Sequence, residues 1–350
     1  MTITVPALLT KSAGASFERG TIERRELGDD DVLIDIAFAG ICHSDIHQAR
    51  EEWGKAIFPM VPGHEIAGTI AAVGSAVDKH AVGDHVGIGC FVDSCGECEN
   101  CTAGNEQFCV KGNVATYNGR EYSGEPTYGG YATQIVAKAD YVLKVPASIP
   151  LDQAAPLLCA GITTYSPLAR FGAGPGKKVA VVGMGGLGHM AVKLAAAMGA
   201  EVSVISQTMS KEADGKRFGA DHYYALSDSD TFGTLRGTFD LIICTISADL
   251  PIDKYLSTLA INGAMVFVGL PPDAQQLRVG SLIGGNKTLA GSNIGGIPET
   301  QEMLDFCAEH NIGAEIETIG ADEVTEAYDR IVKSDVRYRF VIDTKTIPAS

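Results

Sequence analysis

The stretch Lys178–Met198, which reads KVAVVGMGGLGHMAVKLAAAM, decides the fold of this chain. It predicts a buried strand over Lys178–Val182, then a glycine-rich turn, and then a helix from about Gly186 to Met198. A second apolar strand is expected at Glu201–Ile205. The turn reads GMGGLG, and a G-x-G-x-x-G turn between a strand and a helix is the fingerprint of a dinucleotide-binding βαβ unit.

The residues of this fingerprint have separate physical roles. Gly183 permits the tight turn, Gly185 lets a pyrophosphate approach the backbone, and Gly188 lets the helix and the strand pack closely. Gly186 and Leu187 complete the loop, and the helix that follows offers free N–H groups and the positive end of its dipole to phosphates. A glycine-rich turn without a ligand is the alternative, and the flanking strand and helix argue against it.

The residues after the second strand indicate which dinucleotide is bound. A carboxylate at the end of that strand would bind the ribose 2′-hydroxyl and select NAD, but no acid stands there. The polar residues present instead are Ser206, Gln207, Thr208 and Lys211. Hydroxyls and a lysine suit a 2′-phosphate through hydrogen bonds and charge, so we expect NADP. The alternative is a helix capped by Ser210, with Glu212 and Asp214 diluting the positive field.

The chain changes pattern on both sides of this unit. Strands alternate with helices in the middle of the chain, which indicates a parallel sheet. The segments expected there are a helical stretch at Leu151–Arg170 and strands at Phe239–Cys244 and Ala264–Val268. Short strands are expected before it at Val32–Phe38, Gly68–Val73 and Tyr131–Val136, and a helix and two strands after it at Ile297–His310, Ile316–Ile319 and Tyr338–Ile342. The prediction is an α/β fold with a doubly wound domain at 152–293 inserted in a mainly β domain of 1–151 and 294–350.

Composition excludes several classes of protein. The 350 residues include 27 Lys plus Arg and 43 Asp plus Glu, for a net charge of −16, which argues against non-specific binding to nucleic acid. Residues Met1–Gly20 lack the pattern of a targeting signal, and no apolar run is long enough to span a membrane. We therefore expect a soluble, cytoplasmic protein of two domains without a membrane partner.

Four of the nine cysteines lie within fifteen residues, at Cys95, Cys98, Cys101 and Cys109. Clustered thiols in a reducing compartment point to a metal rather than to disulfides. Four thiolates at this spacing can close tetrahedrally around one zinc ion, which leaves no open position and predicts a structural site. A zinc ribbon that binds nucleic acid is the alternative, and the acidic charge of the chain weighs against it.

A second possible metal set is dispersed along the chain. Cys42, His64 and Cys159 would provide two thiolates and one imidazole, a three-ligand set that leaves a fourth position open for substrate. Taken separately, Cys159 is equally consistent with a buried core thiol and His64 with a turn histidine. The sequence alone leaves open whether the three side chains meet.

Several long segments resemble those of the zinc-dependent medium-chain alcohol dehydrogenases of the cinnamyl alcohol dehydrogenase type. They run from about Gly40 to Asp343 and read GICHSDIHQAR, FPMVPGHEIAG, VGDHVGIGCFVDSCGECENC, TYGGYA, APLLCAGITTYSP, VVGMGGLGHMAVKLA, GADHY and DVRYRFVID. The resemblance implies a Rossmann cofactor domain inserted in a GroES-like catalytic domain, a homodimer, and two zinc ions per chain.

The resemblance also assigns the metal and proton-transfer residues. It implies that Cys42, His64 and Cys159 bind the catalytic zinc, which Glu65 can approach, and that the four clustered cysteines bind the structural zinc. Asp45 would stand behind the ligands and fix their orientation. Ser44 matches the hydroxyl beside the metal, and His47 matches the histidine that passes the proton to solvent.

The residues implied for the cofactor are Ser44, Thr163, Gly183–Gly188, Ser206, Lys211, Thr245, Gly269 and the run Ser292, Asn293 and Ile294, with Gln207 and Thr208 in the same loop as Ser206. Gln207 departs from the family, because relatives often have a basic residue in this part of the loop. His43 matches a place where other members use a base against the pyrophosphate. Trp53 is expected to line the substrate cleft, with a packing role as its alternative.

The expected function is an NADP(H)-dependent alcohol dehydrogenase or aldehyde reductase that acts on primary alcohols and aldehydes, aromatic or medium-chain aliphatic. A polyol dehydrogenase and an NAD-dependent alcohol dehydrogenase of the same superfamily are the alternatives. A zinc-free quinone reductase would lack both cysteine sets. A non-enzymatic structural homologue would tolerate the loss of Ser44, His47 or a zinc ligand, yet all are present.

Overall fold

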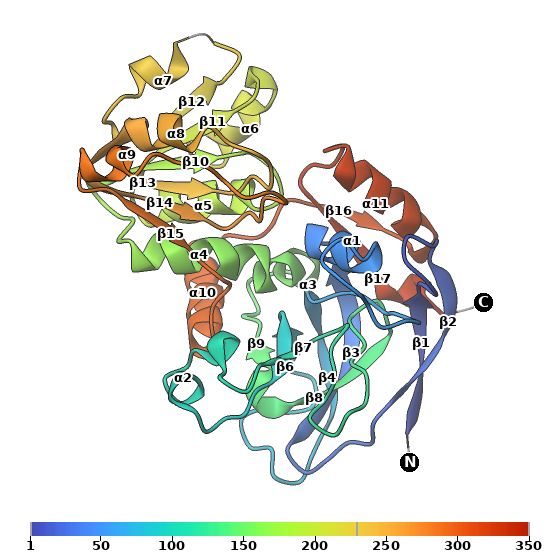
Figure 1. Ribbon diagram of the computed structural model, residues 1–350. Helices are drawn as coiled ribbons and strands as arrows, with labels where there is room; N and C mark the ends of the chain where they lie inside the picture. The colour runs from blue at the N-terminus through green and yellow to red at the C-terminus, as the bar shows by residue number, and fades with distance from the viewer. Residues whose placement is uncertain (1, 229, 349–350) are drawn as a thin grey trace. The chain divides into compact units, whose positions relative to one another are not determined.

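The computed structural model describes residues 2–228 and 230–348 and divides the chain into two compact units (Figure 1). Unit 1 comprises Met1–Cys159 and Gly295–Ser350, and unit 2 comprises Ala160–Ile294. The middle of the chain is thus inserted between two parts of unit 1. The first boundary follows Cys159 rather than residue 151, because the helical stretch that begins at Leu151 is interrupted at Cys159.

Unit 2 is built on a six-stranded parallel sheet with the order β12-β11-β10-β13-β14-β15 (Figure 1). This order is that of a doubly wound dinucleotide-binding sheet, as the sequence predicts, and it reverses between β10 and β13. The strands are β10 (Lys178–Val182), β11 (Glu201–Ser206), β12 (His222–Ala225), β13 (Phe239–Cys244), β14 (Leu259–Phe267) and β15 (Thr288–Gly291). The helices are α4 (Ala160–Arg170), α5 (Gly188–Ala197), α6 (Glu212–Arg217), α7 (Thr231–Thr234), α8 (Ile252–Thr258) and α9 (Gly280–Ile283).

The turn between β10 and α5 has the geometry that its glycines permit. Gly183 has a φ of 96°, in the left-handed region that favours glycine, and its N–H donates to the Ile205 carbonyl at 2.9 Å. A Cβ atom on Gly188 would lie 2.1 Å from the Gly183 carbonyl oxygen, so no side chain fits there. The close approach of strand and helix therefore depends on Gly188.

Unit 1 is built on a seven-stranded sheet with the order β16-β17-β3-β4-β5-β9, in which β8 also pairs with β3. Two further two-stranded sheets are formed by β1 with β2 and by β6 with β7. The strands are β1 (Ile3–Leu9), β2 (Glu18–Arg24), β3 (Asp31–Gly40), β4 (Ile66–Val73), β5 (His85–Ile88), β6 (Phe91–Asp93), β7 (Val114–Ala115), β8 (Gln134–Lys138), β9 (Leu143–Lys144), β16 (Ile316–Ile319) and β17 (Arg339–Asp343). The helices are α1 (His43–Ala49), α2 (Glu99–Thr102), α3 (Leu151–Ala154), α10 (Ile297–Glu309) and α11 (Val324–Val332).

The core of unit 1 fixes helix α1, which begins directly after β3. Ile46 and Ala49 of α1 are buried in one apolar cluster with Val324 and Tyr328 of α11 and Phe340 of β17. The first and last parts of the chain therefore share one core. This packing gives the polar side chains at the start of α1 a rigid support.

Two predictions of secondary structure need correction. The strand expected at Tyr131–Val136 begins only at Gln134, because the backbone of Tyr131 is paired elsewhere. The carbonyl of Tyr131 accepts a hydrogen bond from Leu8 N–H, and the N–H of Tyr131 donates to the carbonyl of Pro62. The helical stretch at Leu151–Arg170 is divided into α3, a 3₁₀ turn at Ala155–Leu158 and α4. Pro156 has no N–H to donate and so favours this break.

No helix within residues 2–228 and 230–348 is long and apolar enough to cross a membrane.

Replacing Gly188 by alanine should lower the free energy of unfolding by about 1–3 kcal/mol, the usual cost of an inserted methyl group in a packed site. The measurement is chemical denaturation followed by circular dichroism. Gly185→Ala is the matched control, because a Cβ there meets no atom within 4 Å. Equal stability of the two variants would contradict the packing role of Gly188.

Candidate metal centres and cofactor site

Cys42, His64, Glu65 and Cys159 converge in unit 1, and their ligand atoms all lie within 4.8 Å of one another. All four residues are buried, and the two sulfur atoms are 4.0 Å apart. Cys42 is the residue before α1, His64 and Glu65 precede β4, and Cys159 follows the 3₁₀ turn described above. The structure thus places residues that are far apart in the sequence in a single buried cluster.

A buried carboxylate, Asp45, holds this cluster together. It accepts hydrogen bonds from the backbone N–H groups of Cys42 at 2.8 Å and Gly63 at 3.1 Å. Its Oδ1 also lies 3.0 Å from Nδ1 of His64. Because Nδ1–H donates to Asp45, Nε2 of His64 is left as the atom that can bind a metal.

Glu65 forms a buried ion pair with Arg339, whose Nη2 donates to Glu65 Oε1. Burial raises the pKa of Glu65 to about 7, while the guanidinium of Arg339 acts in the opposite direction. The second oxygen, Oε2, has no hydrogen-bond partner in the described part of the chain. A buried oxygen without a partner is costly, and a cation among the four side chains would compensate it.

The donor set fits zinc. Two thiolates and an imidazole are ligands that zinc prefers. The hydrogen bond between the two thiols lowers the pKa of Cys42, which favours its thiolate form, and raises the pKa of Cys159. The fully buried Glu65 carboxylate adds a fourth donor that the Arg339 pair holds nearby. The residues present can therefore bind one divalent ion.

Ser44 and His47 lie on the first two turns of α1. Ser44 Oγ is 3.6 Å from Cys42 Sγ, so the hydroxyl lies directly beside the cluster. His47 is one turn further along the helix, with its ring stacked on Trp53 at a centroid distance of 4.7 Å. About a quarter of the His47 side chain is exposed, and Nδ1 lies 2.5 Å from Glu52 Oε2.

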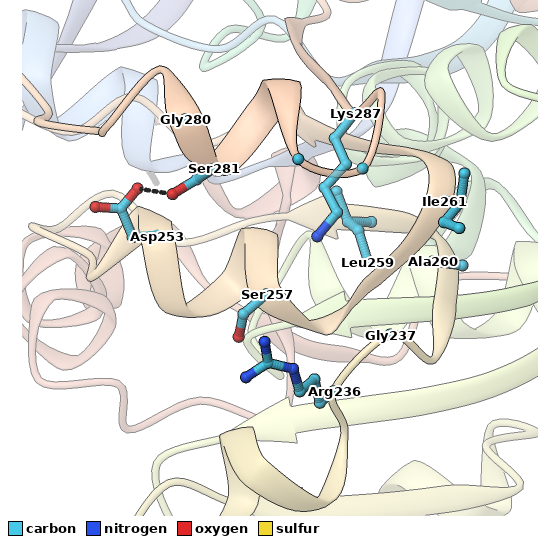
Figure 2. A pocket seen from close by; sticks show the side chains of 12 residues that line it. Arg236, Gly237, Asp253, Ser257, Leu259, Ala260, Ile261, Gly280, Ser281 and Lys287 are labelled. Atoms are coloured by element: carbon cyan, nitrogen blue, oxygen red, sulfur yellow. Dashed lines mark hydrogen bonds between the residues drawn. The ribbon is translucent and has the colours of Figure 1, made fainter.

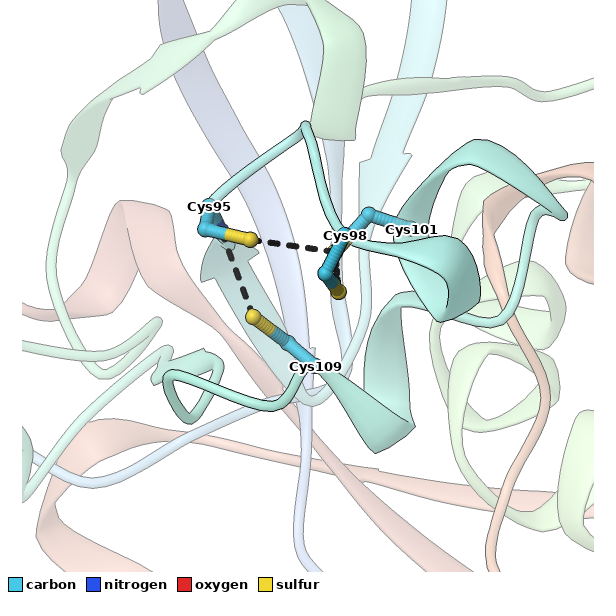
Figure 3. Close-up of side chains that lie close together, drawn as sticks. All are labelled: Cys95, Cys98, Cys101 and Cys109. Carbon is cyan, nitrogen blue, oxygen red and sulfur yellow. Dashed lines mark hydrogen bonds between the residues drawn. The ribbon is translucent and has the colours of Figure 1, made fainter.

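The second cluster contains Cys95, Cys98, Cys101 and Cys109, whose sulfur atoms face one another (Figure 3). Cys101 Sγ lies 3.4 Å from Cys98 Sγ and 3.9 Å from Cys95 Sγ. The backbone N–H of Cys95 donates to Cys109 Sγ at 3.4 Å. Backbone hydrogen bonds lower the pKa of Cys98 to about 6, which favours a thiolate. Four thiol donors without a further ligand fit a closed, structural zinc site.

The residues implied for the cofactor in unit 2 follow the carboxyl ends of parallel strands. They are Gly183 after β10, Ser206 at the end of β11, Thr245 after β13, Gly269 after β14 and Ser292 after β15. Ligands of open α/β sheets bind at this edge, at the point where the strand order reverses. Thr163 lies on α4, and Ser44 belongs to unit 1.

The loop after β11 does not have the helix cap at Ser210 that was the alternative interpretation of its sequence. Thr208, not Ser210, caps the short helix that follows, because Thr208 Oγ1 accepts from Ser210 N–H. Lys211 donates through Nζ to the carbonyl of Met184 at 2.8 Å, which brings its charge to the fingerprint loop. At the other end of the unit, Ile294 has a φ of 38°, a strained conformation for a β-branched residue.

The sequence did not single out two residues near the metal cluster. Arg339 lies in the segment DVRYRFVID, but its pairing with Glu65 depends on β17 lying beside β3. Cys90 belongs to neither cysteine pattern, yet its thiol forms a hydrogen bond with Cys159 that lowers the pKa of Cys90. No periodicity or spacing in the sequence indicates either contact.

Unit 2 also contains a surface pocket of about 540 Å³ that includes none of the residues discussed so far (Figure 2). Arg236 and Lys287 are among the residues that line it, and Asp253 accepts a hydrogen bond from Ser281 Oγ at 2.7 Å. Lys287 Nζ donates to the carbonyl of Leu256. The polar groups are exposed or already paired, so the pocket has no converging set of chemical groups.

Comparison with known proteins places this geometry among enzymes. Residues 28–147 match the model for the alcohol dehydrogenase GroES-like domain, and residues 186–309 match that for the zinc-binding dehydrogenase. The chain is 60% identical over 340 residues to the probable formaldehyde dehydrogenase AdhA of Bacillus subtilis, covering 97% of each chain. It is 58% identical over 345 residues to NADP-dependent alcohol dehydrogenase C 1 of Mycolicibacterium smegmatis, covering 98% of this chain and 99% of the other.

The similarity extends to solved structures. The crystal structure of CAD from Helicobacter pylori complexed with NADP(H) superimposes with a TM-score of 0.93 and 45% sequence identity, covering 99% of both chains. The fold predicted from the sequence is therefore confirmed in both of its parts.

Metal analysis of the purified protein should give two zinc ions per chain. Cys98→Ser should retain one and lose thermal stability, because a structural zinc site contributes directly to folding. Cys42→Ala should also retain one zinc ion, with the smaller loss of stability.

Cys244→Ala is the control for these variants, because Cys244 is buried in β13 outside both clusters. It should keep two zinc ions. A wild-type protein with one zinc ion or none would contradict the assignment of one cluster or of both.

Proposed function

The chain belongs to the zinc-dependent alcohol dehydrogenase family, and on that premise we propose that it interconverts primary alcohols and aldehydes by hydride transfer with NADP(H). The observation that supports this most directly is the buried cluster of Cys42, His64 and Cys159. Three ligands with a fourth position for substrate are the arrangement of catalytic zinc. Glu65 lies close to that position but is paired with Arg339, so it can leave the position to substrate.

The protein's own residues prepare this position. A zinc ion bound there supplies Lewis-acid polarisation of the substrate oxygen. Asp45 fixes the ring of His64 and, through two backbone N–H groups, the segments on which Cys42 and His64 lie. Glu65 compensates positive charge in the cluster, and Arg339 holds this carboxylate in place.

Reduction of an aldehyde needs a hydride at carbon and a proton at oxygen. Ser44 is suited to the proton transfer because its hydroxyl lies beside the cluster, 3.6 Å from Cys42 Sγ. His47 is suited to exchange the proton with water because its ring is partly exposed and an imidazole can both accept and donate a proton. In alcohol oxidation the same proton moves in the opposite direction.

The loop after β11 supports NADP over NAD. Ser206, Gln207 and Thr208 offer hydrogen bonds without an acidic group that would repel a 2′-phosphate. Lys211, whose ammonium lies at the Met184 carbonyl, adds positive charge next to the fingerprint. The Gly183–Gly188 loop and the N-terminus of α5 are suited to bind the pyrophosphate.

Trp53 is proposed to line the substrate site. The residue is 45% exposed and its ring stacks on His47, so an apolar surface remains available close to the proton-transfer residues. Aromatic and medium-chain aldehydes have an apolar body that such a face can contact.

The reducing conditions that nine free thiols require favour a cytoplasmic location.

We further propose a homodimer formed through unit 2. β15 lies at the edge of its sheet and pairs only with β14 within the described residues. Ile261, Val279 and Ile283 expose between 64% and 77% of their surface on the same unit, next to the pocket of Figure 2. An edge strand beside exposed apolar side chains is suited to pairing with a second copy.

The activity is tested with a panel of aldehydes, including formaldehyde, benzaldehyde and cinnamaldehyde, assayed with NADPH and NADH in parallel. We expect turnover with NADPH and a kcat/KM at least about tenfold lower with NADH, a difference of about 1.4 kcal/mol in transition-state binding. Cys42→Ala should abolish turnover while the circular dichroism spectrum is retained. Full activity of this variant would refute a catalytic role for the cluster.

Sedimentation equilibrium should give twice the mass of the 36.7 kDa chain. Ile283→Asp should shift the protein toward the monomer, because a charge in a buried apolar contact is strongly unfavourable. Glu326→Gln, a change of an exposed side chain on α11 of unit 1, is the control and should remain a dimer. A wild-type monomer at micromolar concentration would disprove the proposed assembly.

A further inference from the structure

The start of helix α10 lies against the loop of the four clustered cysteines. Oε2 of Glu106, in this loop, accepts a hydrogen bond at 3.0 Å from the N–H of Ile297, the first residue of α10. The backbones are also in close contact. A Cβ atom on Gly296 would lie 1.8 Å from the carbonyl oxygen of Gly104 and 2.6 Å from Glu106 Oε2, so no side chain fits at position 296.

The cysteine loop fixes the position of Glu106. This residue begins a 3₁₀ turn, Glu106–Phe108, that lies between Cys101 and Cys109 in the sequence. The carbonyl of Glu106 accepts from Cys109 N–H at 3.0 Å, and Gly104 N–H donates to the carbonyl of Cys101 at 3.1 Å. The carboxylate that contacts α10 is therefore attached to backbone held on both sides by residues of the four-thiol cluster.

Glu106 serves as the cap that α10 lacks. The first N–H groups of a helix have no partner within the helix, and a polar side chain on the preceding residue usually accepts from one of them. In α10 the preceding residue is Gly296, which has no side chain to offer. A carboxylate from a distant part of the chain takes this role, and its negative charge also suits the positive end of the helix dipole.

The residues just before α10 connect the two units. Ser292 N–H donates to the carbonyl of Phe267 at 3.0 Å, which fixes the end that follows β15. The cap fixes the other end at Ile297. The connector between them, residues 293–296, contains the strained Ile294, with a φ of 38°. Ser292 and Ile294 belong to the run implied for the cofactor, so the two anchored ends hold a cofactor segment in an unfavourable backbone conformation.

Stability of the helix alone is a poor explanation for the cap. Further along α10, the side chain of Gln301 exchanges two hydrogen bonds with the backbone of Lys144, at 2.9 and 3.0 Å. Met303, Leu304 and Cys307 are buried in the middle of the helix. The helix is thus attached without Glu106, and the cap acts mainly on the first turn and on the connector before it.

We propose that Glu106 is a positioning residue for the binding of NADP(H). Its carboxylate, held by the cysteine loop, caps α10 and thereby keeps the connector in the conformation that presents residues 292–294 to the cofactor. Without the cap, one end of the connector is released, and cofactor binding must then order it at a cost in conformational entropy. This inference rests on the proposed function.

The test is the affinity of the full-length, zinc-loaded protein for NADPH, measured by fluorescence titration. Glu106→Ala should raise the Kd about fivefold, the size expected for the loss of a helix cap. Glu106→Gln keeps an acceptor oxygen and should raise the Kd less than about twofold. The KM for NADPH should follow the Kd, while kcat at saturating NADPH should change less than about twofold. Both variants should keep two zinc ions per chain.

Glu97→Ala is the matched control. It removes a carboxylate from the same cysteine loop, but the partner of Glu97 is the exposed Lys111 rather than α10. This variant should bind NADPH as the wild type does. A purely structural effect of losing a carboxylate from the loop would lower the melting temperature and leave the Kd unchanged.

Hydrogen–deuterium exchange of the protein without NADPH gives a readout that needs no activity. The amides of residues 293–297 should exchange faster in Glu106→Ala than in the wild type, and at the wild-type rate in Glu97→Ala. Three results would overturn the inference: an unchanged Kd in Glu106→Ala, unchanged exchange in Glu106→Ala, or an equal rise of Kd in Glu97→Ala. A wild-type protein that does not bind NADPH would instead refute the proposed function, and the exchange rates would still decide whether Glu106 fixes the connector.

Discussion

The buried carboxylate of Asp45 is the contact on which the candidate active site depends. It joins the start of α1 to the segment before β4 through hydrogen bonds from Cys42 N–H, Gly63 N–H and His64 Nδ1. A buried charge is tolerated only when it is fully paired, so this group also forces both segments into one arrangement. Tyr131 adds a weaker contact through its hydroxyl, 3.4 Å from Asp45 Oδ2.

Other elements of unit 1 place Arg339 and Cys159 at the metal cluster. β17 pairs with the end of β3, which places Arg339, from the last part of the chain, against Glu65. Cys159 lies between the 3₁₀ turn and α4, where the helical stretch that begins at Leu151 is interrupted. The pair between Glu65 and Arg339 thus joins the two parts of unit 1 that flank unit 2 in the sequence.

Local features of the fold could be predicted from the sequence, and long-range ones could not. The strand Lys178–Val182, its glycine turn and the four clustered cysteines each depend on residues close together in the chain. The alternation of strands and helices was enough to predict the parallel sheet. The late start of β8 depends instead on long-range hydrogen bonds of Tyr131 with Leu8 and Pro62. The break at Pro156 is a local effect of proline that the sequence analysis did not predict.

Side-chain partners were the least predictable part of the site. The convergence of Cys42, His64 and Cys159 was anticipated only through family resemblance, since nothing in their spacing requires it. Arg339 and Glu52 were not singled out, because an arginine in a strand and a glutamate in a charged turn are ordinary surface residues in a sequence. Their contacts appear only when the fold places Arg339 at Glu65 and Glu52 at His47.

Anomalous diffraction at the zinc absorption edge tests the central claim most directly. The account predicts two peaks per chain, one of them about 2.3 Å from the sulfur atoms of Cys42 and Cys159 and about 2.0–2.1 Å from His64 Nε2, with one further coordination position. A map with a peak at the four clustered cysteines but none between Cys42, His64 and Cys159 would contradict it.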